Sequence, residues 1–224
     1  MTRCANFPVI YGCLPVSVRF RPTLAYNSPP TVFILRIIGG SARGTRLSTF
    51  SGLNVRPTPD RVREAVFSIL FSRLGKFEGK KVLDLYAGSG AMALEALSRG
   101  ADTATLVERD PKAIRLIEAN ARTCRLNDFV HIIRSDVDSA LRKMDGNNPF
   151  DLIFLDPPYD LSLTASALES IDRQGLLAQN GIVCAECGRK EEPAQMIGSL
   201  SLIDSRRYGL TSVHLFVHTE QGED

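Results

Sequence analysis

Along most of the chain, short apolar runs alternate with longer stretches in which apolar residues recur every three or four positions. The short runs predict buried strands, and the longer stretches predict amphipathic helices. The predicted strands cover residues 81–85, 103–108, 130–134, 150–156, 181–186, 200–207 and 211–218. The predicted helices cover residues 91–99, 111–124, 136–144, 163–174 and 192–197. This alternation is typical of a parallel sheet with helices on both faces.

A smaller unit precedes the alternating region. Residues 32–47 predict two short strands around Gly39 and Gly40. In the helix that follows, Thr58 is a suitable N-cap and Pro59 suits the first helical position. Apolar residues recur in this helix at helical spacing: Val62, Val66, Ile69, Leu70 and Leu74. They predict one buried face.

The chain ends in two predicted strands that are separated by a turn at Tyr208 and Gly209, so they can pair as an antiparallel hairpin. We therefore expect an α/β fold with a Rossmann-like, mostly parallel sheet, a C-terminal antiparallel hairpin and a small N-terminal extension of hairpin and helix. With 224 residues the chain can bury one substantial core. The predicted division is a disordered extension at 1–33, the hairpin and helix at 34–75, and the main domain at 76–224.

Residues 1–33 have several prolines and no clear hydrophobic period, which predicts disorder. Two interpretations of this segment stay open. Its lack of acidic residues resembles an organellar transit peptide, although it has no clear amphipathic arginine helix. Alternatively, the start codon is misplaced and the functional chain begins near Ile34. We expect a cytoplasmic protein. If residues 1–33 are a transit peptide, the protein would be directed to an organelle.

Charge is unevenly distributed along the chain. Residues 1–59 contain seven arginines and no Asp or Glu, which leaves 20 of the 27 basic residues against all 25 acidic residues in the remainder. A basic end on an acidic body is typical of a protein that docks a polyanion through that end. Arginines that only solvate a surface would give the same composition.

The five cysteines are odd in number and scattered, which indicates reduced thiols in an intracellular protein. Cys184 and Cys187 have the spacing of a metal or redox pair. They fall within a predicted strand, where residues three apart point to opposite faces, so we expect no metal there. The chain has no apolar run of membrane-spanning length, and we expect no membrane partner.

Acidic residues follow three successive predicted strands. Asp84 ends the first strand, Glu108 ends the second, and Asp136 comes just after the third. Ligands of open α/β sheets bind beyond the carboxyl ends of the strands, so these side chains should converge on one crevice. Helix capping would explain each acid taken singly. Three together favour a nucleoside ligand, with Glu108 accepting hydrogen bonds from a ribose diol.

The turn after Asp84 contains Gly88 and Gly90, which let a ligand approach the backbone at the start of a helix. A glycine-rich turn alone is weak evidence, because many doubly wound proteins have one. Moreover, Ala93 stands where a dinucleotide-binding fingerprint would have its third glycine.

The fourth predicted strand ends in Asp156, Pro157, Pro158 and Tyr159. Two prolines remove two N–H donors and stiffen the backbone, so carbonyl oxygens here can serve as fixed acceptors. The exocyclic amino group of a base presents two donor hydrogens, which a carboxylate and a backbone carbonyl can accept together. The tyrosine ring offers a stacking face for that base. An ordinary Pro-Pro turn is the alternative, and the three preceding acids in register argue against it.

With these motifs the chain resembles class I S-adenosylmethionine-dependent methyltransferases, and more narrowly the RsmD family of bacterial 16S ribosomal RNA guanine-N2 methyltransferases. The resemblance covers about residues 36–217. It depends on R-I-I-G-G-S-A-R-G, R-P-T-P-D-R-V-R-E, D-L-Y-A-G-S-G, L-E-A-L-S-R-G, D-P-P-Y and the closing G-L-T-S-V. The block R-P-T-P-D-R-V-R-E is much more discriminating than the glycine turn.

The resemblance implies a cofactor, S-adenosylmethionine, and its binding residues. These are Asp84, Tyr86, Ala87, Gly88, Gly90, Glu108, Arg109, Ser135 and Asp136. The acid and glycines that follow the first strand would line the methionine part, Glu108 would bind the ribose hydroxyls, and Ser135 with Asp136 would lie by the adenine.

The resemblance also implies how the substrate is held. Asp156, Pro157 and Tyr159 would hold the target guanine. The implied RNA-contacting residues are Arg36, Arg43, Arg46, Arg56, Thr58, Arg61 and Arg63. The partner would be 16S ribosomal RNA within an assembling small subunit, and we expect a monomer that needs no metal.

The implied reaction is direct displacement, in which the guanine N2 attacks the methyl carbon of the sulfonium. Three alternatives stay open. An adenine-N6 DNA methyltransferase is the nearest, because D-P-P-Y also serves adenine amines, although such enzymes usually need an added target-recognition domain. A nicotinamide-dependent oxidoreductase is disfavoured by the incomplete glycine fingerprint. The third is a non-catalytic RNA-binding module.

Overall fold

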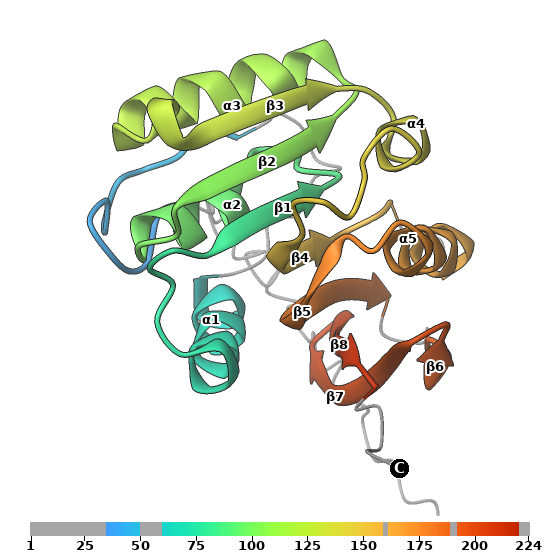
Figure 1. Ribbon diagram of the computed structural model, residues 1–224. Helices are drawn as coiled ribbons and strands as arrows, with labels where there is room; N and C mark the ends of the chain where they lie inside the picture. Colours follow the sequence, from blue (N-terminus) through green and yellow to red (C-terminus); the bar gives the residue numbers. More distant parts are fainter. Residues whose placement is uncertain (1–34, 50–59, 159–160, 189–191, 220–224) are drawn as a thin grey trace, which may run out of the picture. The chain divides into compact units, whose positions relative to one another are not determined.

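The strands in the described part of the chain form one eight-stranded sheet. A computed structural model describes residues 35–49, 60–158, 161–188 and 192–219, all of which lie in one unit, Phe33–Asp224. The strands are β1 (Lys81–Leu85), β2 (Thr103–Glu108), β3 (Val130–Arg134), β4 (Phe150–Leu155), β5 (Leu177–Gly188), β6 (Met196–Ile197), β7 (Leu200–Tyr208) and β8 (Thr211–His218). Their order across the sheet is β3-β2-β1-β4-β5-β8-β7-β6 (Figure 1).

The first five strands are parallel, and the last three are antiparallel to their neighbours. The chain direction therefore reverses only after β5, where a short strand and a long hairpin close one edge of the sheet. The predicted mostly parallel sheet and C-terminal antiparallel hairpin are confirmed. Among the described residues, no helix is long and apolar enough to cross a membrane.

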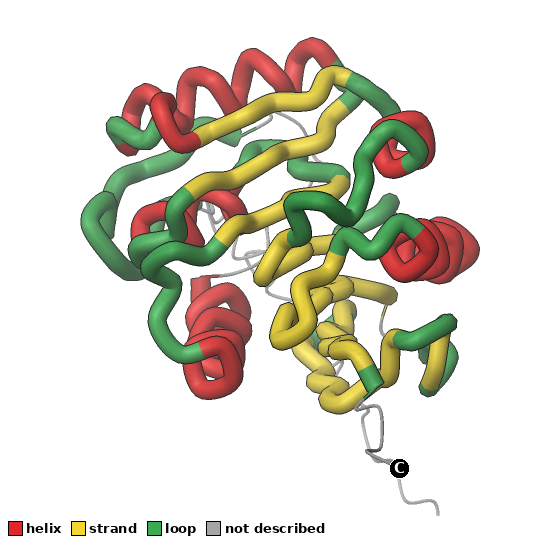
Figure 2. The backbone as a smooth tube through the Cα atoms, in the orientation of Figure 1, coloured by secondary structure: helices red, strands yellow, loops and turns green. Residues whose placement is uncertain are grey.

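Helices cover both faces of the sheet (Figures 1 and 2). They are α1 (Asp60–Leu74), α2 (Ala91–Ser98), α3 (Pro111–Cys124), α4 (Val137–Leu141) and α5 (Leu161–Arg173), with a 3-10 turn at Asn127–Phe129. The first three helices pack on one face with Val82 and Leu152, and the last two pack on the other with Leu83 and Ile153. Successive residues of a strand thus pack in the hydrophobic cores on opposite faces of the sheet, because side chains alternate between the two faces along a strand. This explains why the central strands are apolar throughout.

Two predicted elements differ from the structure. The helix predicted at 192–197 is wrong, because residues 192–195 are irregular and Met196–Ile197 is a short edge strand that pairs with β7. There the exposed Met196 and the buried Ile197 follow the period of a strand. In its described part, residues 35–47, the N-terminal hairpin has no regular strands, only an antiparallel bridge between Arg36 and Arg46 around a turn. Thr58 and Pro59 lie outside the described residues, and the predicted division at residues 75–76 remains a prediction.

The N-terminal hairpin docks on α2 through two polar side chains of that helix. The backbone N–H groups of Ile38 and Gly39 donate to the carboxylate of Glu95, at 2.7 and 2.8 Å. The Ser98 hydroxyl donates to the Gly39 carbonyl at 2.6 Å and accepts from the N–H of Ala42 at 2.9 Å. Glu95 and Ser98 are both buried, so these bonds replace hydration that the groups have lost. The motifs R-I-I-G-G-S-A-R-G and L-E-A-L-S-R-G are therefore two halves of one contact.

Gly40 allows this close approach, and its substitution should be costly. Its φ is +77°, and a Cβ built there would lie 1.7 Å from the Ser98 carbonyl oxygen. We expect Gly40→Ala to lower the free energy of unfolding by on the order of 3 kcal/mol, because the clash with backbone adds to left-handed strain. Urea unfolding checks this. Gly75→Ala is the matched control, since its φ is +71° but nothing lies within 4 Å of the new Cβ. Equal losses for the two variants would contradict the docking role of Gly40.

Candidate functional site

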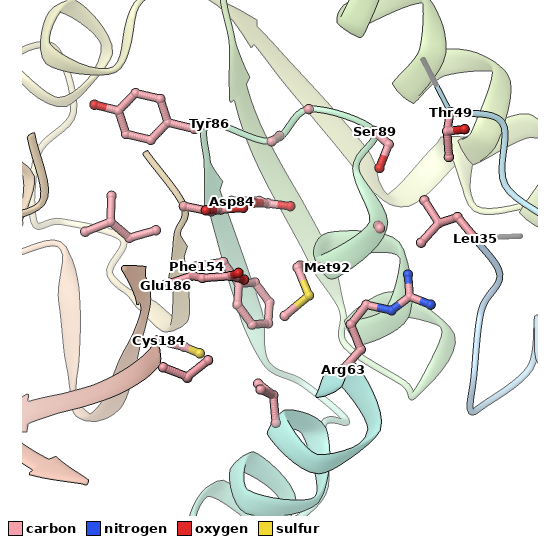
Figure 3. Close-up of a pocket in the computed structure, with 17 residues that line it drawn as sticks. Leu35, Thr49, Arg63, Asp84, Tyr86, Ser89, Met92, Phe154, Cys184 and Glu186 are labelled. Atoms are coloured by element: carbon pink, nitrogen blue, oxygen red, sulfur yellow. The ribbon is translucent and has the colours of Figure 1, made fainter. Parts of the chain in front are cut away.

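A pocket opens at the carboxyl ends of β1, β4 and β5, with the start of α2 and part of α1 as further walls (Figure 3). The residues predicted to bind the cofactor or the base that line it are Asp84, Tyr86, Ala87, Gly88 and Asp156. They come from the turn after β1 and from the end of β4, which are neighbouring strands. The structure thus brings the glycine turn and the D-P-P-Y motif to one place, as expected for the carboxyl edge of a parallel sheet.

The turn after β1 has a backbone suited to a ligand. Tyr86 has a φ of +62°, which is uncommon for a residue with a side chain, and Gly88 has a φ of +56°. A Cβ at Gly88 would meet only the Tyr86 carbonyl oxygen, 3.9 Å away, so this glycine leaves room beside the pocket. Gly90 differs, because a Cβ there would press on Leu106 at 3.2 Å and on Ile117 at 3.4 Å. Gly90 therefore serves the packing of the turn on the core.

Glu108 fixes this turn. One of its carboxylate oxygens accepts from the N–H of Gly88 at 2.9 Å, and the other accepts from the N–H groups of Arg109 and Asp110 at 2.8 and 2.9 Å. A carboxylate has about four acceptor positions, so three bonds leave capacity for one further donor. Glu108 lies beside the turn and outside the set of pocket-lining residues, and its predicted contact with a ribose remains a prediction.

Asp84 is the most deeply buried acid of the pocket. Its side chain is 4% exposed, and Oδ2 accepts from the N–H of Ala93, in the first turn of α2, at 3.1 Å. Burial raises the pKa of Asp84 to about 8; the Ala93 hydrogen bond opposes this shift, and the charge of Glu108 adds to it. Without a ligand, the carboxyl group is therefore largely protonated at neutral pH. A cationic ligand group would favour its ionised form.

Asp156 and Glu186 form an acidic wall with Asp84. Leu155 of β4 pairs with Ala185 of β5. Asp156, directly after β4, and Glu186, near the carboxyl end of β5, therefore lie on neighbouring strands. Asp156 lines the pocket and is exposed to solvent there, next to the buried Leu155 and Pro157. The protein atoms around its carboxyl group partly desolvate it, which raises the pKa of Asp156 well above its ordinary value, and the charges of Glu186 and Asp84 raise the pKa further. Such a wall favours a ligand that brings positive charge or N–H donors.

The cysteines of the C-x-x-C sequence lie in β5, and both are buried. Cys184 lines the pocket, and burial, followed by the charge of Glu186, raises the pKa of its thiol. The thiol therefore stays protonated at physiological pH. Within the described ranges, no group of three or more His, Cys, Asp or Glu side chains is arranged to hold a metal ion.

Ser135, Asp136 and Arg109 follow β3 and β2 and lie outside the pocket-lining set. Asp136 is exposed and caps α4, because its Oδ1 accepts from the N–H of Ser139 at 2.8 Å. This hydrogen bond lowers the pKa of Asp136. A capping role of this kind is the alternative that the sequence left open for a single acid, and the predicted contact of Ser135 and Asp136 with adenine remains a prediction.

The arginines predicted to contact RNA do not share one environment. Arg43, Arg46 and Arg61 are exposed, and Arg36 is exposed while its Nε donates to Asp60 at 2.7 Å. Arg63 differs from the expectation, because its side chain is 1% exposed and lines the pocket. A guanidinium in this position is shielded from any phosphate on the surface. Arg56, Thr58 and the predicted base-stacking Tyr159 lie outside the described residues, while Pro157 is buried next to Asp156.

Sequence reasoning missed Glu186. It concentrated on the two cysteines of C-A-E-C and passed over the acid between them. The available signal was the one used for Asp84 and Asp156, because Glu186 is an acidic residue at the end of the predicted strand 181–186. The pocket also contains apolar residues that no motif marks, among them Met92 and Phe154.

The sheet order, the reversed final strands and the pocket beside the glycine turn define a class I methyltransferase fold, whose methyl donor is S-adenosylmethionine. The predicted fold class and cofactor are confirmed at this level. The chain belongs to the family described as Conserved hypothetical protein 95, the RsmD family, whose model matches residues 35–217. This membership confirms the resemblance seen in the motifs and removes the nicotinamide-dependent oxidoreductase from the alternatives.

Relatives match over most of the chain. Ribosomal RNA small subunit methyltransferase D of Escherichia coli K12 is 31% identical over 189 residues, which cover 84% of this chain and 92% of that protein. YlbH of Bacillus subtilis 168, named as a candidate rRNA methyltransferase, is 36% identical over 183 residues, covering 81% and 98%. Among solved structures, the candidate methyltransferase yhhF of E. coli has a TM-score of 0.71 at 29% identity, covering 84% of this chain and 99% of that one.

Proposed function

We propose that this protein transfers a methyl group from S-adenosylmethionine to the exocyclic N2 amine of a guanine in 16S ribosomal RNA. The observation that carries this proposal is the position of Asp156, at the end of β4 and in the same pocket as Asp84 and the glycine turn. An acceptor for a base amine thus lies beside a place for the methyl donor. The names of the curated relatives, which describe small-subunit or ribosomal RNA methyltransferases, support RNA as the substrate.

The pocket fits the methyl donor chemically. Asp84 and Glu186 suit the positive charge of its amino acid end, and the open side of Gly88 leaves space for its chain. Glu108 would hold the ribose, as class I methyltransferases place an acid at the end of the second strand. When bound, S-adenosylmethionine supplies an electrophilic methyl group on a sulfonium, and its sulfur keeps the electron pair of the broken bond.

Asp156 would act on the other reactant. The guanine N2 is a poor nucleophile because its lone pair is delocalised into the ring. In the proposed complex, the Asp156 carboxylate and the Pro157 carbonyl accept the two amine hydrogens, which orients the nitrogen and stabilises the positive charge that grows on it. Because its raised pKa makes Asp156 a stronger base than an ordinary aspartate, it is also suited to take the proton that nitrogen loses.

The basic residues of the N-terminal segment would bind the RNA backbone. Arg43 and Arg46 belong to the exposed part of the hairpin, and Arg61 is exposed in the first turn of α1. Guanidinium groups in these positions can pair with phosphates, and such contacts supply affinity without base specificity. This role concerns only the exposed arginines, and it leaves Arg63 to be explained otherwise.

Arg61→Ala should weaken RNA binding roughly 3- to 10-fold at low salt and reduce the slope of log affinity against log salt by about one. The reason is that one phosphate contact and its released counterion are lost. Filter binding of 16S ribosomal RNA over a salt series measures both quantities. Arg115→Ala removes an exposed arginine from α3 and is the matched control. An unchanged salt slope for Arg61→Ala would show that Arg61 is a solvated surface residue that contacts no phosphate.

The substrate is tested by transfer of label from methyl-tritiated S-adenosylmethionine. Free 16S ribosomal RNA, assembling small subunits and duplex DNA are offered in parallel to the full chain. We expect label in the ribosomal RNA, either free or in the subunit. Label in DNA with unlabelled RNA would replace the proposal by an adenine-N6 DNA methyltransferase, and binding of RNA without any transfer would indicate a non-catalytic module.

A further inference from the structure

Arg63 is a buried cation with donors to spare. Its side chain is 1% exposed, and Nη2 donates to the Arg36 carbonyl at 2.6 Å and to Asp60 Oδ1 at 2.8 Å. Among the described residues, Nε and Nη1 have no hydrogen-bond partner. Within the described part of the chain, three N–H hydrogens of this guanidinium are therefore buried and unsatisfied, a state that costs free energy and that native proteins mostly avoid. A ligand that supplies acceptors would remove this cost.

The unsatisfied donors belong to a side chain that lines the candidate site. Arg63 extends into the pocket from α1, whereas Asp84 and Glu186 reach it from β1 and β5 (Figure 3). Burial lowers the pKa of Arg63, while the charges of Asp60 and Glu95 raise it. A guanidinium remains charged at neutral pH even so. The pocket thus offers carboxylates on its strand side and one fixed positive charge on its helix side.

A pocket with this distribution of charge suits a ligand that carries both signs. The amino acid end of S-adenosylmethionine has an ammonium group, a sulfonium and a carboxylate. The acidic wall can bind the positive groups, but it would repel the carboxylate, which needs a separate cationic partner. In the pocket as described, Arg63 is the residue that can provide one.

We propose that Arg63 binds the carboxylate of the methionine end of S-adenosylmethionine, through its Nη1 or Nε donors. The inference rests on the proposed function, because it presumes that cofactor. It gives the arginine block R-P-T-P-D-R-V-R-E a second task, since Asp60 and the Arg36 carbonyl hold the guanidinium while its other side faces the ligand. A charge-assisted bond to a desolvated carboxylate is among the stronger polar contacts in proteins.

The test compares two ligands that differ only in the carboxylate. S-adenosylhomocysteine and its decarboxylated analogue are titrated calorimetrically into the full chain, as wild type, Arg63→Gln, Arg63→Lys and Arg115→Gln. We expect Arg63→Gln to lower the affinity for S-adenosylhomocysteine at least 10-fold and the affinity for the decarboxylated analogue less than 2-fold. Arg63→Lys should recover part of the difference because it keeps the charge. Arg115→Gln should bind both ligands as the wild type does.

The outcomes distinguish a failure of the Arg63 contact from a failure of the proposed function. Equal losses of affinity for both ligands in Arg63→Gln would show that Arg63 only supports the fold. Unchanged affinity for S-adenosylhomocysteine would show that Arg63 binds no carboxylate. Either result overturns the inference and leaves the proposed function standing. If Arg63→Gln does not fold by circular dichroism, the ratio of the two affinities in Arg63→Lys decides in the same way. A wild type that binds neither ligand would overturn the proposed function itself.

Discussion

Asp156→Ala is expected to reduce methyl transfer about 10³-fold or more while changing the affinity for S-adenosylhomocysteine less than about 3-fold. The variant loses the acceptor that orients the base amine and the group that takes its proton, and effects of these two kinds are large. The methyl donor should be little affected, because Asp84 and the glycine turn remain. Single-turnover transfer of tritium to 16S ribosomal RNA and calorimetric titration of S-adenosylhomocysteine measure the two quantities.

Two comparisons sharpen this result. Asp138→Ala removes an exposed carboxylate from α4 and should transfer methyl groups as the wild type does. The wild-type rate should fall as the pH is lowered, with a midpoint well above the ordinary range of an aspartate, because desolvation and the charge of Glu186 raise the pKa of Asp156 and the carboxylate form is required. A collapse of cofactor affinity in Asp156→Ala would mean that Asp156 serves the methyl donor and not the base.

Asp84→Asn should raise the free energy of unfolding of the ligand-free protein, relative to the wild type, by up to about 4 kcal/mol more at pH 8 than at pH 5. Below about pH 3 the carboxyl group is protonated in both the folded and the unfolded chain, so its burial then costs no ionisation free energy. Because folding raises the pKa of Asp84 to about 8, the unfolded chain ionises first as the pH rises, and stability is lost up to that pH. Asparagine avoids the loss and can still accept the Ala93 N–H bond.

The same substitution should weaken the binding of S-adenosylhomocysteine at least 10-fold. A cationic ligand group is attracted by the ionised carboxylate of Asp84, and asparagine carries no charge. Urea unfolding of the ligand-free chain at both pH values and calorimetric titration measure the two effects. Asp102→Asn, an exposed aspartate in the loop before β2, is the control that should show neither. A variant that is destabilised equally at pH 5 and pH 8 would contradict the buried, protonated state of Asp84.

The order of strands and helices followed from the sequence because each central strand is buried on both faces. An apolar run such as that of β4 leaves little choice of structure, and its end is marked by Asp156 and two prolines. The edge of the sheet was harder. The segment at 192–197 is short and partly exposed, so neither helical nor strand periodicity is established over so few residues, and pairing with β7 decides its structure.

Site residues could be predicted from the sequence where a motif directly follows a strand. They could not be predicted where the site depends on contacts between segments far apart in the sequence. Asp84 and Asp156 were identified from their positions at strand ends. The environment of Arg63 could not be, because an arginine at a helix start is usually exposed, and its burial depends on contacts with Arg36 and Asp60. The close packing of Gly40 against Ser98 is similarly a tertiary contact between segments 58 residues apart, which no local pattern specifies.

The measurement that tests the central claim most directly is nucleoside mass spectrometry of 16S ribosomal RNA after incubation with the protein and S-adenosylmethionine carrying a deuterated methyl group. The deuterium distinguishes new methyl groups from those already in the RNA. The account predicts deuterated N2-methylguanosine, and fragment mapping should place it at one position. Deuterium in N6-methyladenosine, or in any other nucleoside in place of N2-methylguanosine, would contradict it.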